Sequence, residues 1–258
     1  MKTNTVREKL RAGEATIGCF MGLQSPNVAE LLGHAGYDWV VIETEHNAFD
    51  TAQVEHALMA LSGTGAIPLV RVPSADHVYI QRALDIGALG VVVPLVRTAA
   101  EAEAIVRATR FPPTGTRSWG PLRASGYTFD NRDYRDRADE NILVVLILET
   151  REAVENLDAI AAVPGIDAIF LGPADLSFAY GVDFLTGIHP PVAAAIEKMI
   201  AVCRARGIAS GLGETSIEAL ERWRARGCTF LAYGPDYALL AGVVRDGLAR
   251  WRASEQTN

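Results

Sequence analysis

Hydrophobic and polar residues alternate along the chain in blocks whose lengths fit strands and helices. Short apolar runs predict strands at residues 15–23, 38–43, 66–72, 88–96, 142–149, 167–172, 208–213 and 229–234. Stretches with helical spacing of apolar residues follow most of them, at 25–36, 50–63, 76–88, 98–110, 150–163, 190–207, 215–227 and 235–251. Strands that alternate with helices are typical of parallel β/α units. Eight such units predict an α/β fold, a (β/α)8 TIM barrel.

Residues that start and stop helices fall near the ends of these segments. The expected N-caps are Ser25, Asp50 or Thr51, Asp76, Thr98, Thr150 and Thr215, and the expected stops are Gly36, Gly63, Gly87, Gly207 and Gly227. One segment does not fit the repeat: residues 111–141 are rich in Pro, Gly, Arg and Asp and predict an irregular insertion. Its aromatic residues favour ordered packing, and they are Trp119, Tyr127, Phe129 and Tyr134. Residues 252–258 are expected to fray.

Length and charge narrow the class of protein. The 258 residues suit one (β/α)8 barrel, so residues 1–258 are interpreted as a single domain. A net charge of -7 disfavours nucleic acid and anionic membranes as partners. The three cysteines, Cys19, Cys203 and Cys228, have no zinc-site or disulfide spacing, and the polar N-terminal segment has no signal-peptide core. We expect a soluble, cytoplasmic protein.

Polar residues without a packing reason stand at the carboxyl ends of several predicted strands, where TIM barrels carry their chemistry. Glu149 closes a long aliphatic run, and Asp175 follows the next strand. Two carboxylates at neighbouring strand ends suit a hard divalent cation that keeps open positions for water and substrate. The alternative is structural, with Glu149 capping a helix near Thr150 and Asp175 beginning a turn.

Two further residues are candidates for other steps of the chemistry. Arg71 ends the third strand and could hold an anionic oxygen, or could form a salt bridge to one of the nearby acids. His46 follows Glu43 and Glu45 after the second strand and could serve as a general base. None of the three lysines, Lys2, Lys9 and Lys198, stands at a strand end, which disfavours Schiff-base chemistry.

Long stretches of the chain resemble a known family. The relevant segments are GCFMGLQSPNVAELLGHAGYDWVVIETEH, RALDIGALGVVVPLV, RATRFPPTGTRSWG and ETREAVENLDAIAAVPGIDAIFLGPADLS. They are similar to the HpcH/HpaI family of metal-dependent, pyruvate-forming aldolases. The resemblance implies reversible retro-aldol cleavage of a 4-hydroxy-2-oxo acid into pyruvate, or a related 2-oxo acid such as hydroxypyruvate, and an aldehyde. It implies no organic cofactor.

The resemblance also implies roles for the candidate residues. Glu149 and Asp175 would hold Mg²⁺, Mn²⁺ or Co²⁺, which chelates the 2-oxo acid. Arg71 would stabilise the enolate oxygen, and His46, paired with Asp85, would handle the proton. In the family Asp85 reaches the site from a neighbouring subunit, so the resemblance implies a homo-oligomer, usually a hexamer.

Substrate contacts and two departures complete what the resemblance implies. Backbone N–H groups at Ala174 and Asp175 would bind the substrate carboxylate, and the other expected contacts are Gly172, Pro173 and Leu212. The family pattern IDGEH is replaced by IETEH, which introduces Glu43 and Thr44, and Ile147 stands where Gln is frequent. We expect these changes to modulate specificity for the aldehyde.

Three other functions remain open from the residues alone. Gly211, Gly213 and Gly234 stand where barrels bind phosphate, as a phosphosugar isomerase or lyase would require. A lyase acting on a CoA ester would need a basic surface, for which Arg117 and Arg123 are the candidates. A non-catalytic metabolite-binding barrel would be expected to lack at least one of His46, Arg71, Glu149 and Asp175, whereas all are present.

Overall fold

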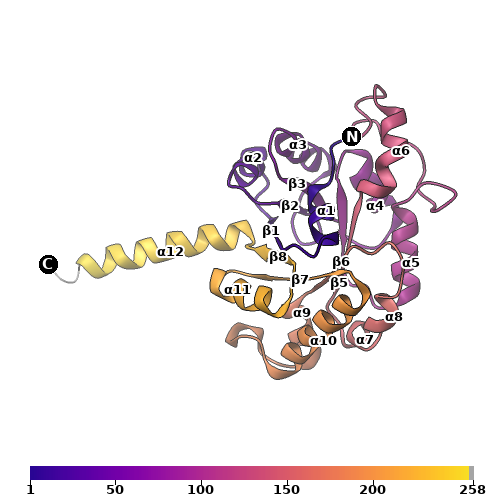
Figure 1. Cartoon of the computed structure of the whole chain (residues 1–258). Coiled ribbons are helices and arrows are strands. Elements are labelled where there is room, and N and C mark those ends of the chain that lie inside the picture. Colours follow the sequence, from indigo (N-terminus) through magenta and orange to yellow (C-terminus); the bar gives the residue numbers. More distant parts are fainter. Residues whose placement is uncertain (256–258) are drawn as a thin grey trace.

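Eight parallel strands close into a barrel in sequence order (Figure 1). The structure is a computed structural model and describes residues 1–255. The strands are β1 (Thr16–Met21), β2 (Trp39–Glu43), β3 (Ile67–Arg71), β4 (Gly90–Val93), β5 (Leu143–Leu148), β6 (Ala168–Leu171), β7 (Ala209–Glu214) and β8 (Phe230–Tyr233). Every strand lies within, or within one residue of, its predicted segment, so the predicted (β/α)8 barrel is confirmed.

Helices surround the barrel, and each helical segment predicted from the sequence overlaps at least one of them. These are α2 (Pro26–His34), α3 (Thr51–Ser62), α4 (His77–Asp85), α5 (Ala99–Ala108), α7 (Arg151–Glu155) with α8 (Leu157–Ile160), α10 (Pro190–Arg206), α11 (Ile217–Arg226) and α12 (Asp236–Glu255). The sequence patterns missed α1 (Thr5–Arg11), α6 (Asn131–Asn141), α9 (Pro173–Tyr180) and the 3-10 helix η1 (Phe184–Thr186). Because α12 continues to Glu255, the part of the predicted frayed end up to that residue is helical; residues 256–258 lie outside the described range.

Most of the predicted helix boundaries are present. Asp50 and Thr98 each form a full capping box, and Gly207 and Gly227 end their helices with positive φ angles. The N-cap predicted at Thr215 is wrong. Ser216 occupies that position instead, because its hydroxyl oxygen accepts a hydrogen bond from the Ala219 N–H at 3.3 Å.

Alternating side chains divide the apolar core into two layers. One layer lies between strands and helices, and the other fills the barrel, where Trp39 stacks on Phe230 with ring centroids 4.1 Å apart. On β2 the interior positions are Trp39, Val41 and then Glu43. The same alternation brings Arg71 to the interior after Leu69. The pleat therefore turns these polar side chains inward at the carboxyl end of the barrel.

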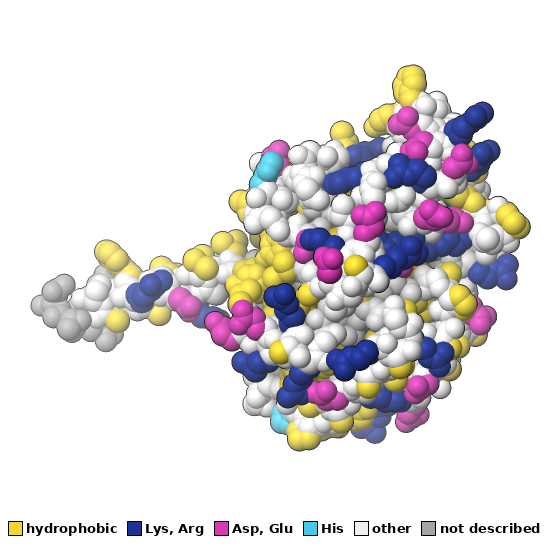
Figure 2. Space-filling view, viewed as in Figure 1, with side chains coloured by type: hydrophobic (Ala, Val, Ile, Leu, Met, Phe, Trp, Pro, Cys, Tyr) yellow, Lys and Arg dark blue, Asp and Glu magenta, His cyan; other side chains and the backbone are white. Residues whose placement is uncertain are grey.

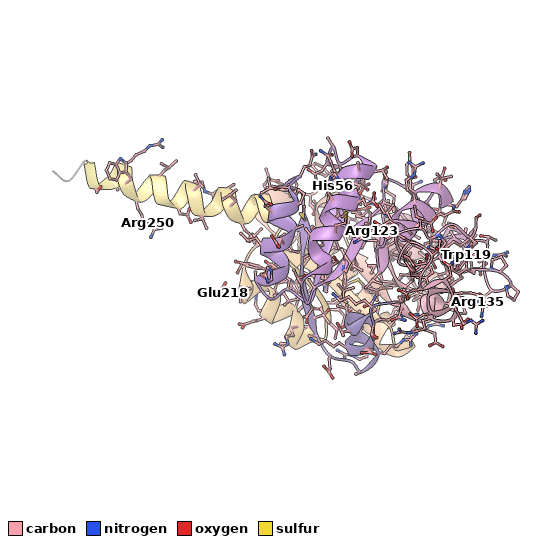
Figure 3. The ribbon with its side chains drawn as sticks, turned by 90° about the horizontal axis from the view of Figure 1, so that it is seen from above. His56, Trp119, Arg123, Arg135, Glu218 and Arg250 are labelled. Carbon is pink, nitrogen blue, oxygen red and sulfur yellow. The ribbon has the colours of Figure 1, made fainter. Side chains whose placement is uncertain are left out.

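The insertion at 111–141 is ordered and contains α6 near its end. Tyr134 is buried and contacts Phe111 and Trp119 edge-on, which confirms the expected packing for Tyr134 and Trp119. The expectation is wrong for Tyr127 and Phe129, which are exposed. Figure 3 shows Trp119 at the end of the molecule opposite α12.

Helix α12 extends away from the barrel, and only its beginning lies against the other elements (Figure 1). Figure 2 shows apolar side chains along this helix. Its exposed large apolar residues are Tyr237, Leu240, Val243, Val244, Leu248 and Trp251. Within residues 1–255, no helix has both the length and the apolar character that crossing a membrane requires.

The tight barrel interior predicts a large effect of Gly18→Ala. A Cβ atom at Gly18 would lie 1.9 Å from Cδ2 of Trp39, whose ring is fixed by its stack on Phe230. We expect the substitution to lower the free energy of unfolding by about 2 to 3 kcal/mol in urea denaturation. Gly65→Ala is the control, because no atom lies within 4 Å of the Cβ position there. Equal stability of the two variants would show that the interior adapts.

Candidate active site

A cavity of about 290 Å³ opens at the carboxyl end of the barrel. It is lined by most of the residues singled out in the sequence, namely Glu43, His46, Arg71, Ile147, Glu149, Gly172, Pro173, Ala174 and Asp175. They come from four different strand ends, so the barrel closure brings together residues that are more than a hundred positions apart in the sequence. Leu212 and Asp85 are not among the lining residues.

Arg71 is the positive centre of a group of carboxylates. Its Nη1 lies 3.0 Å from Oε2 of Glu43, its Nη2 pairs with Glu45, and the same Nη2 lies 3.8 Å from Oε2 of Glu149. Glu43 and Arg71 are direct partners in the register of β2 and β3. The salt bridges that the sequence left open as an alternative are therefore present. The guanidinium nevertheless lines the cavity, where it can also meet a substrate oxygen.

Glu149 is a buried carboxylate with only 3% of its surface exposed. Burial raises the pKa of Glu149 to about 7, while Arg71 and the Leu95 N–H oppose that rise and the charge of Asp175 adds to it. The Leu95 N–H donates to Oε1 at 2.9 Å. Glu149 does not cap the next helix, because Thr150 takes that position. Its second oxygen faces the cavity side of Gly172, whose absent Cβ would lie 2.7 Å from it.

The start of α9 forms one wall of the cavity. Gly172 is the N-cap of α9 and has no side chain that could cap the helix. Pro173 is the first helical residue, and Ala174 and Asp175 follow. The first backbone N–H groups of a helix have no partner within the helix and carry partial positive charge. This end of α9 can therefore bind an anion such as a carboxylate. Asp175 belongs to the first helical turn rather than to an isolated turn.

His46 lies at the mouth of the cavity with 63% of its side chain exposed. Its Nε2 is 3.3 Å from Oε2 of Glu45, and its backbone N–H donates to Oε1 of Glu43, also at 3.3 Å. The expected partner Asp85 lies instead at the end of α4, where it accepts a hydrogen bond from Arg117 at 2.7 Å. A single chain, as described for residues 1–255, does not pair His46 with Asp85.

The structure does not bring the side chain of Leu212, an expected substrate contact, to the cavity. Leu212 is fully buried in the layer between strands and helices, because its place in the alternation of β7 turns it outward. Gly213 lines the cavity in its place. The same alternation identifies Phe20, Phe170 and Ala232 as apolar lining residues that the sequence interpretation missed.

Two lining residues gave no recognisable signal in the sequence. Asn47 lies in the loop after His46, and Tyr237 lies in the first turn of α12. Their positions depend on how these segments fold back over the barrel. The Cβ position at Gly22 lies 2.8 Å from the Tyr237 ring and 3.2 Å from the Asn47 side chain, so a side chain at Gly22 would displace both.

The donor set at the cavity fits one class of metal ion. Among residues 1–255, no group of three or more His, Cys, Asp or Glu side chains is arranged to hold a metal, which disfavours a closed zinc site. Glu149 and Asp175 supply two carboxylates, and their charges act on each other. Mg²⁺ and similar hard cations are bound by one or two carboxylates and keep several waters. The pair therefore fits such an ion together with substrate oxygens.

The structure does not support the phosphate site or the basic CoA-binding surface that the rival functions require. Buried Asp236 stands at the start of α12, where its carboxylate accepts the N–H groups of Gly22 and Leu23 at 2.8 and 3.1 Å and would repel a phosphate. Arg117 has no exposed side-chain surface, so it cannot bind the nucleotide of a CoA ester. Arg123 donates to the Ile86 carbonyl at 2.9 Å.

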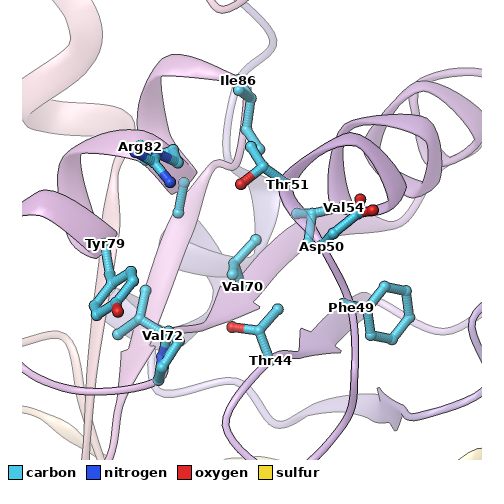
Figure 4. Close-up of a pocket in the computed structure, with 12 residues that line it drawn as sticks. Thr44, Phe49, Asp50, Thr51, Val54, Val70, Val72, Tyr79, Arg82 and Ile86 are labelled. Carbon is cyan, nitrogen blue, oxygen red and sulfur yellow. The ribbon is translucent and has the colours of Figure 1, made fainter.

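A second crevice lies outside the barrel between α3 and α4 (Figure 4). Phe49, Val54, Val70 and Tyr79 give it mostly apolar walls, and Arg82 lies at its side. Thr44, expected from the sequence to modulate specificity, lines this crevice, whereas the candidate catalytic and metal-binding residues His46, Arg71, Glu149 and Asp175 line the cavity at the end of the barrel. We therefore place the chemistry in the cavity at the end of the barrel.

Known proteins share this barrel over nearly its whole length. A hydroxypyruvate/pyruvate aldolase from Pseudomonas aeruginosa is 39% identical over 253 residues, 98% of this chain and 94% of that one. A 5-keto-4-deoxy-D-glucarate aldolase from Shigella dysenteriae is 38% identical over 242 residues, 94% of each chain. The crystal structure of an HpcH/HpaI aldolase/citrate lyase family protein from Burkholderia cenocepacia has a TM-score of 0.91 to this structure and 33% sequence identity. The match covers 97% of this chain and 100% of that one.

The family model described as HpcH/HpaI aldolase/citrate lyase matches residues 16–242. This range begins with the first barrel strand and extends into α12, so it includes every residue that lines the cavity. The chain therefore belongs to the HpcH/HpaI aldolase/citrate lyase family.

Proposed function

We propose that residues 1–258 form one catalytic domain, a divalent-metal-dependent aldolase that reversibly cleaves a 4-hydroxy-2-oxo acid into pyruvate or hydroxypyruvate and an aldehyde. The observation that carries the proposal is the buried carboxylate of Glu149, placed beside Arg71, Asp175 and the start of α9 in one cavity. The names of the similar aldolases support a 2-oxo acid as the donor.

Glu149 and Asp175 are the proposed ligands of Mg²⁺, Mn²⁺ or Co²⁺. The bound ion would polarise the 2-oxo group as a Lewis acid. The N–H groups of Ala174 and Asp175 would hold the substrate carboxylate against the start of α9, beside Gly172 and Pro173. Arg71 would stabilise negative charge on the enolate oxygen, because its guanidinium is already fixed by carboxylates on one side.

His46 is the proposed acid and base for the proton of the C4 hydroxyl. Its backbone is held by Glu43, whose Oε1 also accepts the N–H of Glu45 at 2.7 Å. Glu43, the departure from the family pattern, thus braces the loop that carries the histidine. We propose that Asp85 of a second copy approaches the exposed ring, since the chain's own Asp85 is not among the residues that line the cavity.

The remaining walls would select the aldehyde. Phe20, Ile147 and Phe170 line the cavity with apolar surface, and Ile147 places no polar group where Gln is frequent in the family. An aldehyde with an apolar substituent would bury that surface favourably, whereas a polyhydroxylated one would leave hydroxyl groups unpaired.

The proposed active form is a homo-oligomer, a hexamer by resemblance to the family. Tyr237, Leu240, Val244, Leu248 and Trp251 form a row on α12, which we call the α12 apolar row, and each is 48% to 65% exposed. A continuous apolar row on a projecting helix marks an interaction site, and a second copy of the barrel is the proposed partner. The three cysteines are free and buried, which fits the proposed reducing cytoplasm.

The aldolase proposal predicts metal-dependent carbon–carbon bond formation. Metal-stripped protein is incubated with pyruvate or hydroxypyruvate and a panel of aldehydes, with Mg²⁺, Mn²⁺ or Co²⁺ added back, and the product is followed by mass spectrometry. We expect aldol product only with metal and faster conversion of apolar aldehydes than of polyhydroxylated ones. Metal binding without any product would contradict the proposal and leave a metabolite-binding barrel.

The raised pKa of Glu149 predicts that metal binding depends on pH. Below about pH 7 the carboxyl holds a proton that the metal must displace, so affinity rises as the pH increases. Between pH 6 and pH 8 we expect the dissociation constant for Mn²⁺ to fall about tenfold in calorimetry. Glu149→Gln should lose most of the binding, whereas Glu43→Gln, a neighbouring buried acid outside the proposed ligand pair, should retain it. A flat pH dependence would argue against Glu149 as a ligand.

The α12 apolar row predicts that its disruption dissociates the oligomer. Light scattering after size exclusion should give about six times the 27.7 kDa chain mass for the unaltered protein. Leu240→Glu with Val244→Glu should reduce that mass, because charges would be buried in the contact. Arg245→Glu lies outside the row and should leave it unchanged. A monomeric unaltered protein would refute the assembly.

A further inference from the structure

Asp85 occupies an unfavourable place for a carboxylate. It is the last residue of α4, where the carbonyl groups of a helix end carry partial negative charge. Its side chain is 17% exposed, so solvent relieves only part of this repulsion. A chain that keeps aspartate at this position must compensate the charge from another element.

Arg117 of the insertion provides that compensation from a fully buried position. Its Nη2 donates to Oδ1 of Asp85 at 2.7 Å and to the hydroxyl of Tyr134 at 2.8 Å. The guanidinium carbon lies 4.6 Å from the ring centre of Phe111 and 5.5 Å from that of Tyr134. The aromatic rings and the ion pair thus hold Arg117 in one orientation.

Stability alone explains this arrangement poorly. Within residues 1–255, the Nε and Nη1 atoms of Arg117 are buried and have no hydrogen-bond partner. A buried charge with unused donors costs free energy, and an apolar side chain between Phe111 and Tyr134 would avoid that cost. The arrangement is better explained by what it does to the carboxylate that Arg117 binds.

The contact fixes one oxygen of Asp85, and no hydrogen bond within residues 1–255 occupies the other. Arg117 binds Oδ1, whereas Oδ2 lies 3.6 Å from the position that a Cβ atom of Gly120 would take. Glycine at that position keeps side-chain atoms away from Oδ2. The carboxylate, 17% exposed, is therefore held in a fixed direction with Oδ2 turned away from Arg117.

We propose that Arg117 is a positioning residue, which orients the Asp85 carboxylate so that its free oxygen can bind the exposed ring of His46 in a second copy. This inference rests on the proposed function, in which that pair moves the proton. The inference also gives the ordered insertion at 111–141 a function, because its aromatic residues Phe111 and Tyr134 enclose the guanidinium of Arg117.

The test compares Arg117→Met with Arg123→Met in the full-length protein. Arg123 is a matched control, because it comes from the same insertion and binds the carbonyl of Ile86, next to Asp85, without touching the carboxylate. With aldol turnover as the readout, Arg117→Met should lower kcat about tenfold and change KM less than about twofold. Arg123→Met should change both less than about twofold.

A double-mutant cycle separates positioning from a general structural role. If Arg117 acts through Asp85, then Arg117→Met causes no further loss of kcat in protein that already carries Asp85→Asn. Additive losses, or equal losses from Arg117→Met and Arg123→Met, would overturn the proposal. If Arg117→Met does not fold, Tyr134→Phe, which removes only the hydroxyl that Arg117 binds, replaces it in the same cycle with the same criteria.

The outcome also distinguishes this inference from the proposed function. Full activity of Asp85→Asn would overturn the role of Asp85 and of Arg117 together, while the aldolase proposal would stand. An inactive Asp85→Asn with a fully active Arg117→Met would overturn only the positioning role. Unaltered protein without any metal-dependent turnover would remove the proposed function, and this inference with it.

Discussion

The mouth of the barrel depends on one interaction, the binding of several carboxylates by Arg71. Glu43, Glu45 and Glu149 all lie within ion-pair distance of this single guanidinium. One positive charge cannot neutralise three negative ones in a poorly solvated site, and burial raises the pKa of both Glu45 and Glu149. The excess negative charge is the physical condition for binding a cation there. It explains how the carboxylates of Glu149 and Asp175 could hold the proposed metal although Arg71 already lies beside them.

The barrel supplies the geometry that makes this cluster possible. The alternation of side chains on β2, β3 and β5 turns Glu43, Arg71 and Glu149 toward the axis just above the apolar interior. The stack of Trp39 on Phe230 fills the space below and excludes water from that side. The apolar interior that stabilises the fold therefore also limits the access of water to Glu149. Folding and the chemistry of the site thus share one cause.

The sequence predicts the ends of the strands well. It predicts poorly the contacts of segments that lie outside the β/α repeat. The strands and most helices follow from periodicity, and Glu149 stands out because a carboxylate ends an aliphatic run. The sequence does not indicate that the Leu212 side chain points away from the cavity, because a position near a strand end does not reveal which way a side chain points, and the alternation along β7 puts Gly213 inside. Helix α9 escapes prediction because its sequence begins with a turn-like Gly172-Pro173 and lacks an apolar stripe, although proline at the first helical position is a start signal.

The pairing of Asp85 with Arg117 could not be predicted, since it depends on the path of an insertion without periodicity. That path turns an unfavourable charge at a helix end into a fixed hydrogen-bond acceptor, while the exposed ring of His46 lies beside Glu45 of its own chain. The chain thus carries both halves of the proposed acid–base pair, and its described residues do not join them. Together with the α12 apolar row, most of which projects beyond its own barrel, this separation makes association a requirement for the proposed chemistry as well as for burial of apolar surface.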